Sequence, residues 1–283
     1  MSIRLGFLGN GNMGFAILKG LVDKGLLQPA ETAVYDPYKP AMERAEALGC
    51  VIFDNEISLT ENSPILLAAV KPQQARQLLE KIGPAAGGKL LISIVAGYDV
   101  STIRNALAGE EGCVSADAEG SAPKADGAQI RILRVMPNTP AMVGAGAFGL
   151  DAGTDATEEE KKLADQWFSA LGLTEWVDES LFAAITGLSG SGPAYVSMFI
   201  EALADGGVRF GLKRNIALRL AEQTVYGTAK LLLDEGYHPA QMKDMVCSPA
   251  GTTIEGVQAL EDGAFRSAVM HAVEAGTVKA QNM

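Results

Sequence analysis

The chain has 283 residues, of which 48% are hydrophobic and 20% are charged, and its net charge is −11. This composition is typical of a folded globular protein with enough apolar material for one or two domains. The acidic balance argues against nucleic acid or an anionic membrane surface as the main partner.

Targeting and redox signals point to the cytoplasm. The first residues contain no basic region followed by an apolar stretch and a cleavage site, so we expect no signal peptide. The apolar runs at 65–70 and 90–95 are too short to span a bilayer. Cys50, Cys113 and Cys247 are widely spaced, and the two histidines also lie far apart. We therefore predict neither a disulfide framework nor a protein-held metal.

In chain order, the first half alternates short apolar runs with helical patterns. Helices are predicted at 13–25 and 41–49, and strands are predicted at 3–9, 32–36, 65–70, 90–95 and 130–136. Such alternation is typical of right-handed βαβ units and a doubly wound parallel sheet, that is, a Rossmann-type α/β domain. The continuously apolar strands favour a sheet that is covered on both faces.

The second half becomes helical. Residues 109–128 show no period and are predicted to form a surface loop, with a functional lid as the alternative. A helix at 157–172 begins with a capping box, and 174–177 is predicted to add a last strand. Further helices are predicted at 179–187, 193–210, 214–234, 239–246 and 252–281. We thus expect a dinucleotide-binding domain at 1–178 and an all-helical domain at 179–283.

A glycine motif joins the first strand to the first helix. Gly9, Gly11 and Gly14 have the spacing G-x-G-x-x-G of the dinucleotide fingerprint. The three glycines allow a tight turn, close approach of the pyrophosphate and close packing of helix on strand. The helix N-terminus then faces the phosphates. Because the motif lies between a strand and a helix, it predicts nucleotide binding and not merely a turn.

The choice of nucleotide stays open. Asp36 ends the second strand, where an acid accepts hydrogen bonds from the adenosine ribose and disfavours a 2′-phosphate. Tyr38, Lys39 and Arg44 follow closely and offer a cover for a phosphate instead. As the alternative, Asp36 only starts the turn that follows it.

Three later strand ends add candidates at the same edge of the sheet. Lys71 and Pro72 stop the third strand, which either turns Lys71 toward the ligand crevice or leaves it as a surface lysine. The small residues at 93–97 leave room for a nicotinamide ring. Asn138 follows the strand at 130–136 and is predicted to face the crevice, although Asn-Thr-Pro also makes an ordinary turn.

The stretch CSPAGTTIEG, residues 247–256, leads from a turn into a helix. Thr252 and Glu255 have the spacing of a capping box. Unpaired N–H groups of the first turn, together with the hydroxyls of Ser248 and Thr253, would form an anion seat. A well-capped helix with no ligand is the alternative.

Several stretches together resemble the pyrroline-5-carboxylate reductase family. They are FLGNGNMG (7–14), AVKPQ (69–73), RVMPNTPAMVGAG (134–146), TGLSGSGPAYV (186–196), LADGGVRFGL (203–212) and HPAQMKDMVCSPAGTTIEG (238–256). The resemblance runs in order over nearly the whole chain. It implies NADP or NAD as cofactor, a cyclic imine carboxylate as substrate and a homodimer formed through the helical domain, in many members assembled further into decamers.

The same resemblance implies roles for individual residues. It marks Thr253 and Ser248 as catalytic, with Thr253 beside the imine nitrogen, and Gly251 and Thr252 as substrate-binding. It marks as cofactor-binding Gly9, Gly11, Asn12, Met13, Gly14, Asp36, Asn55, Val70, Lys71, Pro72, Ala96, Gly97 and Asn138. The chain departs from the family pattern in a longer 109–128 loop and in Ala250, where a glycine is usual.

Two other functions fit part of this pattern. A 3-hydroxy acid dehydrogenase is also a Rossmann domain followed by helices, but the region ITGLSGSGPAYVSMF lacks the catalytic lysine of those enzymes. A non-catalytic nucleotide sensor would keep the glycine motif without needing the anion seat at 248–253. Oligomerisation is expected in addition, because the apolar faces at 195–204 and 220–233 exceed what one small bundle hides.

Overall fold

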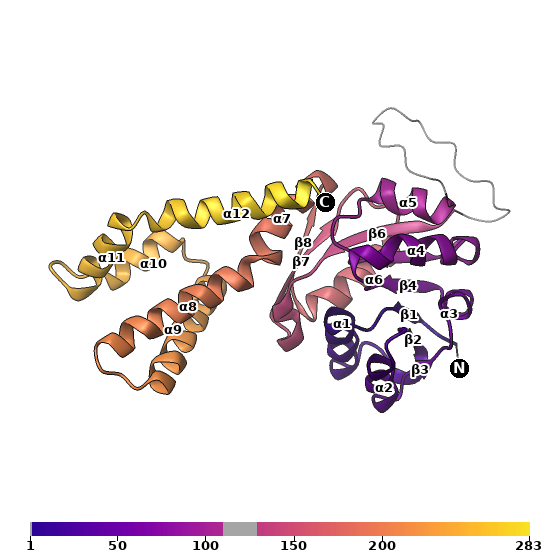
Figure 1. The fold of residues 1–283 in the computed structure, drawn as a ribbon, viewed down its shortest axis with the longest axis horizontal. Helices are drawn as coiled ribbons and strands as arrows, with labels where there is room; N and C mark the ends of the chain where they lie inside the picture. The colour runs from indigo at the N-terminus through magenta and orange to yellow at the C-terminus, as the bar shows by residue number, and fades with distance from the viewer. Residues whose placement is uncertain (1, 110–128) are drawn as a thin grey trace. The chain divides into compact units, whose positions relative to one another are not determined.

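The computed structural model describes residues 2–109 and 129–283. It divides into two compact units (Figure 1). The first unit comprises residues 1–190 and 277–283, and the second comprises residues 191–276. The loop predicted at 109–128 lies outside the described residues, except for Gly109, which ends a helix in the left-handed conformation.

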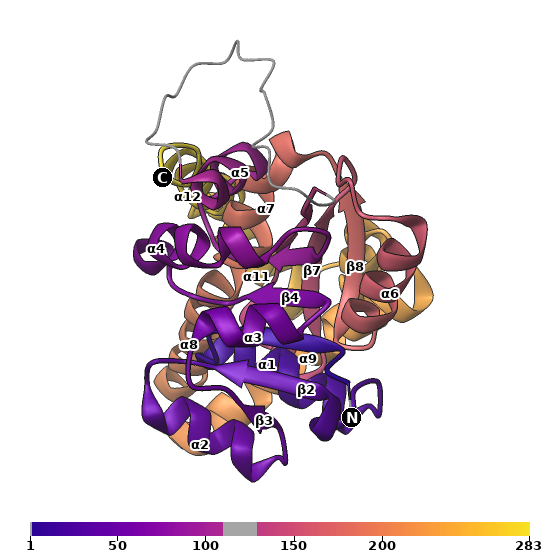
Figure 2. The ribbon, with the colours of Figure 1, turned by 90° about the vertical axis from the view of Figure 1, so that its right-hand side faces the viewer.

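The first unit is built on one eight-stranded sheet, visible in Figure 2. Its strands lie in the order β3-β2-β1-β4-β5-β6-β7-β8. Their bounds are β1 Leu5–Leu8, β2 Thr32–Tyr35, β3 Val51–Ile52, β4 Ile65–Ala68, β5 Leu90–Ser93, β6 Arg131–Met136, β7 Gly146–Asp151 and β8 Gly172–Val177. The order reverses between β1 and β4, so the carboxyl ends of these strands flank the crevice where doubly wound sheets bind ligands.

Helices cover both faces of this sheet. Alternate strand residues point to opposite faces, so Phe7 and Leu67 belong to one apolar cluster and Leu8 and Leu66 to the other. The first cluster includes residues of α1, α2 and α6, and the second includes residues of α3, α4 and α5. Their bounds are α1 Asn12–Asp23, α2 Lys39–Ala47, α3 Glu56–Asn62, α4 Pro72–Ile82, α5 Val100–Ala108 and α6 Glu158–Ser169. The predicted Rossmann architecture is confirmed.

The sheet is not parallel throughout, which corrects the sequence prediction. β7 was not predicted, and it pairs antiparallel with β6 through Val135 and Met136. The connection of residues 137–145 is too short for a crossover, so the chain turns back on itself. The last strand predicted at 174–177 is present as β8, and it pairs parallel with β7.

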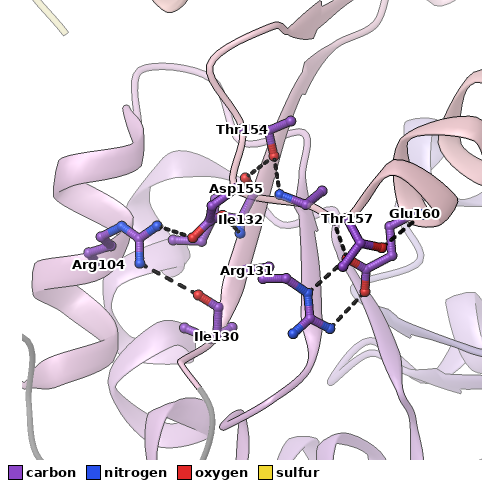
Figure 3. A network of polar contacts seen from close by, with 9 residues as sticks. Arg104, Ile130, Arg131, Ile132, Thr154, Asp155, Thr157 and Glu160 are labelled. Atoms are coloured by element: carbon purple, nitrogen blue, oxygen red, sulfur yellow. Dashed lines mark hydrogen bonds and ion pairs between the residues drawn. The ribbon is translucent and has the colours of Figure 1, made fainter.

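Where β7 does not pair with β6, side chains form hydrogen bonds with the backbone groups of β6 (Figure 3). The Ile132 N–H donates to Asp155 Oδ1 at 2.7 Å, and the Thr154 hydroxyl donates to the Ile132 carbonyl at 2.6 Å. Arg104 of α5 forms an ion pair with Asp155. Residues outside the strand thus occupy backbone groups that an exposed edge would leave open to another chain.

The same network anchors α6. The predicted capping box is present, because Thr157 and Glu160 exchange hydrogen bonds at the start of this helix. Arg131 also donates to both carboxylate oxygens of Glu160 at 2.7 and 2.8 Å. Although burial raises the pKa of the Glu160 carboxyl, the hydrogen bonds from Arg131 lower it below its usual value.

The second unit is helical and follows α7 (Phe182–Ile185) and a π-helical turn at Thr186–Gly190. Its helices are α8 Gly192–Arg209, α9 Arg214–Glu235, α10 Pro239–Val246, α11 Thr252–Asp262 and α12 Phe265–Gln281, of which the last continues into the first unit. The single helix predicted at 252–281 is wrong: the chain breaks at Gly263 and Ala264, where Ala264 has φ +53°. A positive φ cannot continue a right-handed helix.

The second unit has almost no core of its own. Its residues are all described, and the buried hydrophobic ones are Ala204, Ala217 and Ala221. Large apolar side chains remain exposed instead, including Met198, Phe210, Leu233 and Met270. Burial of apolar area is the main favourable term in folding, so three alanines leave this unit poorly stabilised alone. Across the described ranges, no helix has the length and apolarity to cross a membrane.

Candidate active site

The glycine motif forms a backbone cradle at the end of β1. Gly9 has φ +95°, and a Cβ there would lie 2.8 Å from the Ala69 carbonyl oxygen. A Cβ on Gly14 would lie 2.7 Å from the Gly9 carbonyl oxygen. Gly11 differs, because a Cβ there would meet nothing within 4 Å. The first and last glycines therefore serve packing, and Gly11 borders the open space that a pyrophosphate needs.

The start of α1 lies directly beside this space. Gly11 is the N-cap residue and has no side-chain cap, and Asn12 and Met13 are the first residues of the helix. Their N–H groups have no partner within the helix, because an α-helix leaves its first N–H groups unpaired. This is the arrangement that binds phosphate groups. The residues present thus fit a dinucleotide.

Asp36 is held rigidly at the end of β2. Its Oδ2 accepts the Asn10 N–H at 2.7 Å, and its Oδ1 accepts the Tyr38 N–H at 2.8 Å. Arg44 donates to the Asn10 carbonyl and stacks over the Phe15 ring, with 4.5 Å between the guanidinium carbon and the ring centroid. The carboxylate keeps further lone pairs for a ribose hydroxyl. The Arg44 side chain is committed to the glycine loop instead of extending freely toward solvent.

Two buried polar atoms in this corner lack a protein partner. Asn10 is fully buried, and its Nδ2 donates to the Ala41 carbonyl at 2.7 Å while its Oδ1 has no hydrogen bond. The Arg44 Nε is also buried without a partner. Buried polar groups are normally satisfied, so such atoms mark a place where a ligand or water completes the structure.

The loops after β4 and β5 complete the crevice. Val70 lies beside Gly9, Lys71 is exposed at the N-cap of α4, and Pro72 is the first residue of that helix. After β5, Ala96 is half-buried, and Gly97 is exposed with φ +77°. The structure therefore brings these predicted residues to the same edge as the glycine motif.

Two predicted cofactor residues have structural partners. Asn55 is the N-cap of α3, and its side chain accepts the Ser58 N–H at 2.9 Å. Asn138 is buried, accepts the Ala147 N–H at 2.9 Å and donates to the Ser189 carbonyl at 3.1 Å. These hydrogen bonds give both residues a role in stabilising the fold, and their contact with a cofactor stays a prediction.

In the second unit, residues 248–251 form a tight turn. The Gly251 N–H donates to the Ser248 carbonyl at 3.1 Å, and Ala250 has φ +55°. Proline at the second position and a positive φ at the third are typical of a type II turn, which favours glycine where Ala250 stands. A Cβ on Gly251 would lie 2.3 Å from Ser248 Oγ, so the Ser248 hydroxyl lies directly over Gly251.

The capping box predicted from Thr252 and Glu255 is wrong. Gly251 is the N-cap of α11, and Thr252 is its first residue, so Glu255 lies one position too late to reach back. The correction leaves the first-turn N–H groups without a side-chain cap. Thr253 is half-buried at the second helical position, close in sequence to the Ser248 hydroxyl. This helix start keeps the donors that an anion requires.

No metal centre is found in the part of the chain that the structure describes, where no three His, Cys, Asp or Glu side chains gather to hold an ion. Of the cysteines there, Cys50 is buried, and burial raises the pKa of its thiol to about 11. Such a thiol is a poor nucleophile at neutral pH.

Sequence patterns did not mark an ion pair beside the β5–α5 loop. Arg134 of β6 donates to Glu179 at 3.1 Å, and the same carboxylate oxygen accepts the Val100 N–H at 2.7 Å. Arg134 and Glu179 are far apart in the sequence. Arg134 begins the stretch RVMPNTPAMVGAG, but no sequence pattern links it to Glu179. Only the folded sheet brings them together.

The strained turn generates a stability prediction. We expect Ala250→Gly to raise the free energy of unfolding by about 0.5 kcal/mol. A left-handed conformation costs a non-glycine residue roughly 1–2 kcal/mol, and the greater freedom of glycine in the unfolded chain offsets about 0.5–1 kcal/mol of this. Urea unfolding at one fixed protein concentration measures the difference.

Ala229→Gly is the matched control, because Ala229 is exposed within α9. There the same substitution should lower the free energy of unfolding by about 1 kcal/mol. If both variants are destabilised alike, position 250 carries no strain in the folded protein.

Comparison with known proteins bears on both units. A family model described as pyrroline-5-carboxylate reductase dimerisation matches residues 179–283. A second, described as NADP oxidoreductase, coenzyme F420-dependent, matches residues 4–97. Solved structures of a reductive aminase from Aspergillus terreus are also similar, one with 18% identity and a TM-score of 0.57, a likeness that shows the fold alone.

Full-length relatives are more informative. The pyrroline-5-carboxylate reductase of Methanosarcina acetivorans is 42% identical over 95% of this chain and 94% of its own length. That of Glycine max is 39% identical over 100% and 96%. The NADP-bound crystal structure of Plasmodium falciparum pyrroline carboxylate reductase has a TM-score of 0.83 at 31% identity, covering 99% of this chain and 97% of that one. The chain belongs to the pyrroline-5-carboxylate reductase family.

Proposed function

We propose that this protein reduces the C=N bond of 1-pyrroline-5-carboxylate with NADPH or NADH and releases L-proline. The observation that carries the proposal is similarity over nearly the full length to named reductases, two of which are 42% and 39% identical. A functional test is oxidation of NAD(P)H by the purified protein with pyrroline-5-carboxylate, with 3-hydroxy acids and nicotinamide nucleotides alone as controls. Turnover of hydroxy acids only would favour the dehydrogenase alternative, and binding without turnover would favour the nucleotide sensor.

The first unit is proposed to hold the dinucleotide, which supplies the hydride when bound. Gly9, Gly11 and Gly14 bring the loop and the start of α1 to the pyrophosphate, and Asp36 faces the adenosine ribose. The other proposed contacts are Asn12, Met13, Asn55, Val70, Lys71, Pro72, Ala96, Gly97 and Asn138. Small residues at 96 and 97 leave space for a flat ring, so most of the rate would come from positioning.

The start of α11 is proposed to hold the substrate carboxylate. The unpaired N–H groups of Thr252 and Thr253, with the hydroxyl groups of Ser248 and Thr253, suit an anion without an arginine. Gly251 is proposed to be substrate-binding as well, because its lack of a side chain keeps the Ser248 hydroxyl close to the helix start. We assign catalytic roles to Thr253 and Ser248.

Thr253 is proposed to orient the imine nitrogen through its hydroxyl. A threonine hydroxyl is a weak acid, so water or an already protonated imine supplies the proton. The iminium form accepts hydride more readily than the neutral imine, which reduces the demand on protein acid catalysis.

We propose the cytoplasm as location, a chain division after Asp178, and no nucleic-acid or membrane partner. The net charge of −11 and the widely spaced cysteines support this assignment. The dimerisation model that begins at residue 179 supports the division. Cell fractionation that finds the protein with membranes would contradict the location.

Oligomerisation should be obligatory. We propose a homodimer through the helical unit, with assembly to a decamer as the further step, because that unit leaves large side chains such as Met198 and Phe210 exposed around a core of three alanines. Sedimentation should find dimers or larger assemblies at micromolar concentration. A stable, active monomer under those conditions would rule the proposal out.

Asp36 should limit the use of NADPH. We expect Asp36→Ser to raise the NADPH/NADH ratio of kcat/KM by roughly threefold to tenfold, because a partly solvated carboxylate repels the 2′-phosphate by about 1 kcal/mol. Steady-state kinetics with both nucleotides measures the ratio. Glu46→Ser is the control: it removes one exposed charge from α2, away from the end of β2, and should leave the ratio unchanged. An unmoved ratio in Asp36→Ser would show that the carboxylate does not face the ribose.

Thr253→Ala should lower kcat/KM for pyrroline-5-carboxylate by roughly tenfold or more, since a lost hydrogen bond to a charged or polar substrate costs about 1.5–3 kcal/mol. The dissociation constant for the nucleotide should barely change. Thr252→Ala keeps the backbone N–H and should lose much less, with little change in stability, because Thr252 is exposed and caps nothing. Full activity in Thr253→Ala would show that the start of α11 has only a structural role and does not bind the substrate through Thr253.

A further inference from the structure

The loop between β5 and α5, residues 94–99, has few backbone contacts of its own. Ile94 N–H donates to the Ala68 carbonyl at 3.1 Å, and beyond it the loop runs past the end of the sheet. Gly97 has φ +77°, and the last residue, Met283, lies beside it. A loop with few backbone hydrogen bonds has many accessible conformations unless something fixes its far end.

Two carboxylates fix that far end. Asp99 is the N-cap of α5 and accepts the Thr102 N–H at 2.7 Å. It does not serve the N–H of Val100, the first helical residue. Glu179 Oε1 accepts that N–H at 2.7 Å. Glu179 therefore acts as a second cap, supplied from a segment far away in the sequence.

Glu179 is itself firmly held. It lies in the short 3-10 turn Glu179–Leu181 that follows β8. The same Oε1 accepts from Arg134 Nη1 at 3.1 Å, and the Arg134 side chain is only 13% exposed. The guanidinium carbon of Arg134 lies 4.6 Å from the centroid of the Phe182 ring, which is buried. Arg134 also pairs in register with Ser93, the last residue of β5.

One carboxylate oxygen thus joins both ends of the loop. Arg134 pairs with Ser93, so it is fixed relative to the end of β5, where the loop begins. Val100 is the first residue of α5, where the loop ends. By binding both residues, Glu179 fixes the distance between the two ends of the loop that contains Ala96 and Gly97. A charge-assisted bond of this kind is stronger than one between neutral groups and fixes geometry as well.

We propose that Glu179 is a positioning residue for the nicotinamide end of the dinucleotide. It acts through the loop at 94–99 and touches neither the cofactor nor the substrate. This inference rests on the proposed function, in which Ala96 and Gly97 border the nicotinamide. A preformed loop lowers the ordering cost of binding and places the ring for transfer, where misplacement by about 1 Å costs up to 100-fold in rate.

Two variants of Glu179 separate its hydrogen bond with Val100 from its charge interaction with Arg134. Glu179→Ala removes the acceptor for the Val100 N–H and the partner of Arg134. Glu179→Gln keeps an oxygen for Val100 and loses only the charge facing Arg134. Nucleotide affinity is measured by titration of NADPH and NADH fluorescence, kcat and both KM values by steady-state kinetics, and stability by thermal unfolding.

We expect Glu179→Ala to weaken nucleotide binding about threefold to tenfold and to lower kcat about tenfold, with KM for pyrroline-5-carboxylate changed less than threefold. Glu179→Gln should restore most of the affinity and of kcat. Glu160→Ala is the matched control. It breaks an ion pair with Arg131, which lies at the amino end of β6, the strand that also contains Arg134. It should lower stability and leave nucleotide affinity unchanged.

The inference is overturned if Glu179→Ala binds nucleotide like the unaltered protein, or if Glu160→Ala loses affinity to the same extent. It is also overturned if Glu179→Gln is no better than Glu179→Ala. Failure of the proposed function has a different signature: the unaltered protein would not oxidise NAD(P)H with pyrroline-5-carboxylate. The fluorescence titrations decide the role of Glu179 in that case too.

Discussion

The Ala69 carbonyl oxygen lies so near Gly9 that a Cβ there would come within 2.8 Å of it. This contact between two backbones fixes the end of β1 against the loop after β4. In the same place, the Ala69 N–H donates to the carbonyl of Leu8, the residue before Gly9, at 2.8 Å. The start of α1, the position of Lys71 and the open space at Gly11 all follow from it. Any larger residue at Gly9 would separate the two strands that flank the crevice.

Fixing backbones this closely leaves the loops around them to be held by side chains. Asp36, which follows β2, accepts the N–H groups of Asn10 and Tyr38, and Glu179 accepts the N–H of Val100 at the start of α5. Each acid accepts from main-chain donors that no strand or helix partner serves. Carboxylates suit this task because an ionised oxygen accepts several bonds and each is stronger than a neutral one. Asp36 and Glu179 thus have structural roles in the loops that follow β1 and β5.

Local patterns predicted local structure well. The glycine motif, most strand positions and the capping box at Thr157 depend on residues within a few positions of one another, and all were recognised from the sequence. The sequence does not predict β7, because GAFGLD has no β-branched residue and the strand gains its stability by pairing with neighbours on both sides. The cap at Thr252 was placed one residue too late, since Gly251 itself takes the N-cap position.

Long-range contacts were beyond reach for a different reason. The bond between Arg134 and Glu179 depends on where β6 and β8 lie in the sheet, and no spacing in the sequence encodes it. The same applies to Asn138, whose burial against Ala147 and Ser189 is a property of the folded sheet.

The two units solve the problem of stability in opposite ways. The sheet buries large side chains such as Trp167, Phe168 and Phe182 on its own, so its crevice can be formed within one chain. In the helical unit three alanines are buried, Ile200, Val208 and Leu218 pack against them partly buried, and larger side chains such as Met198 and Phe210 are exposed. Its turn at 248–251, with Ala250 in a conformation that suits glycine, must then be supported from elsewhere. In the proposed homodimer, a second copy of the chain would cover these apolar side chains, and the start of α11 would gain its rigidity from that association.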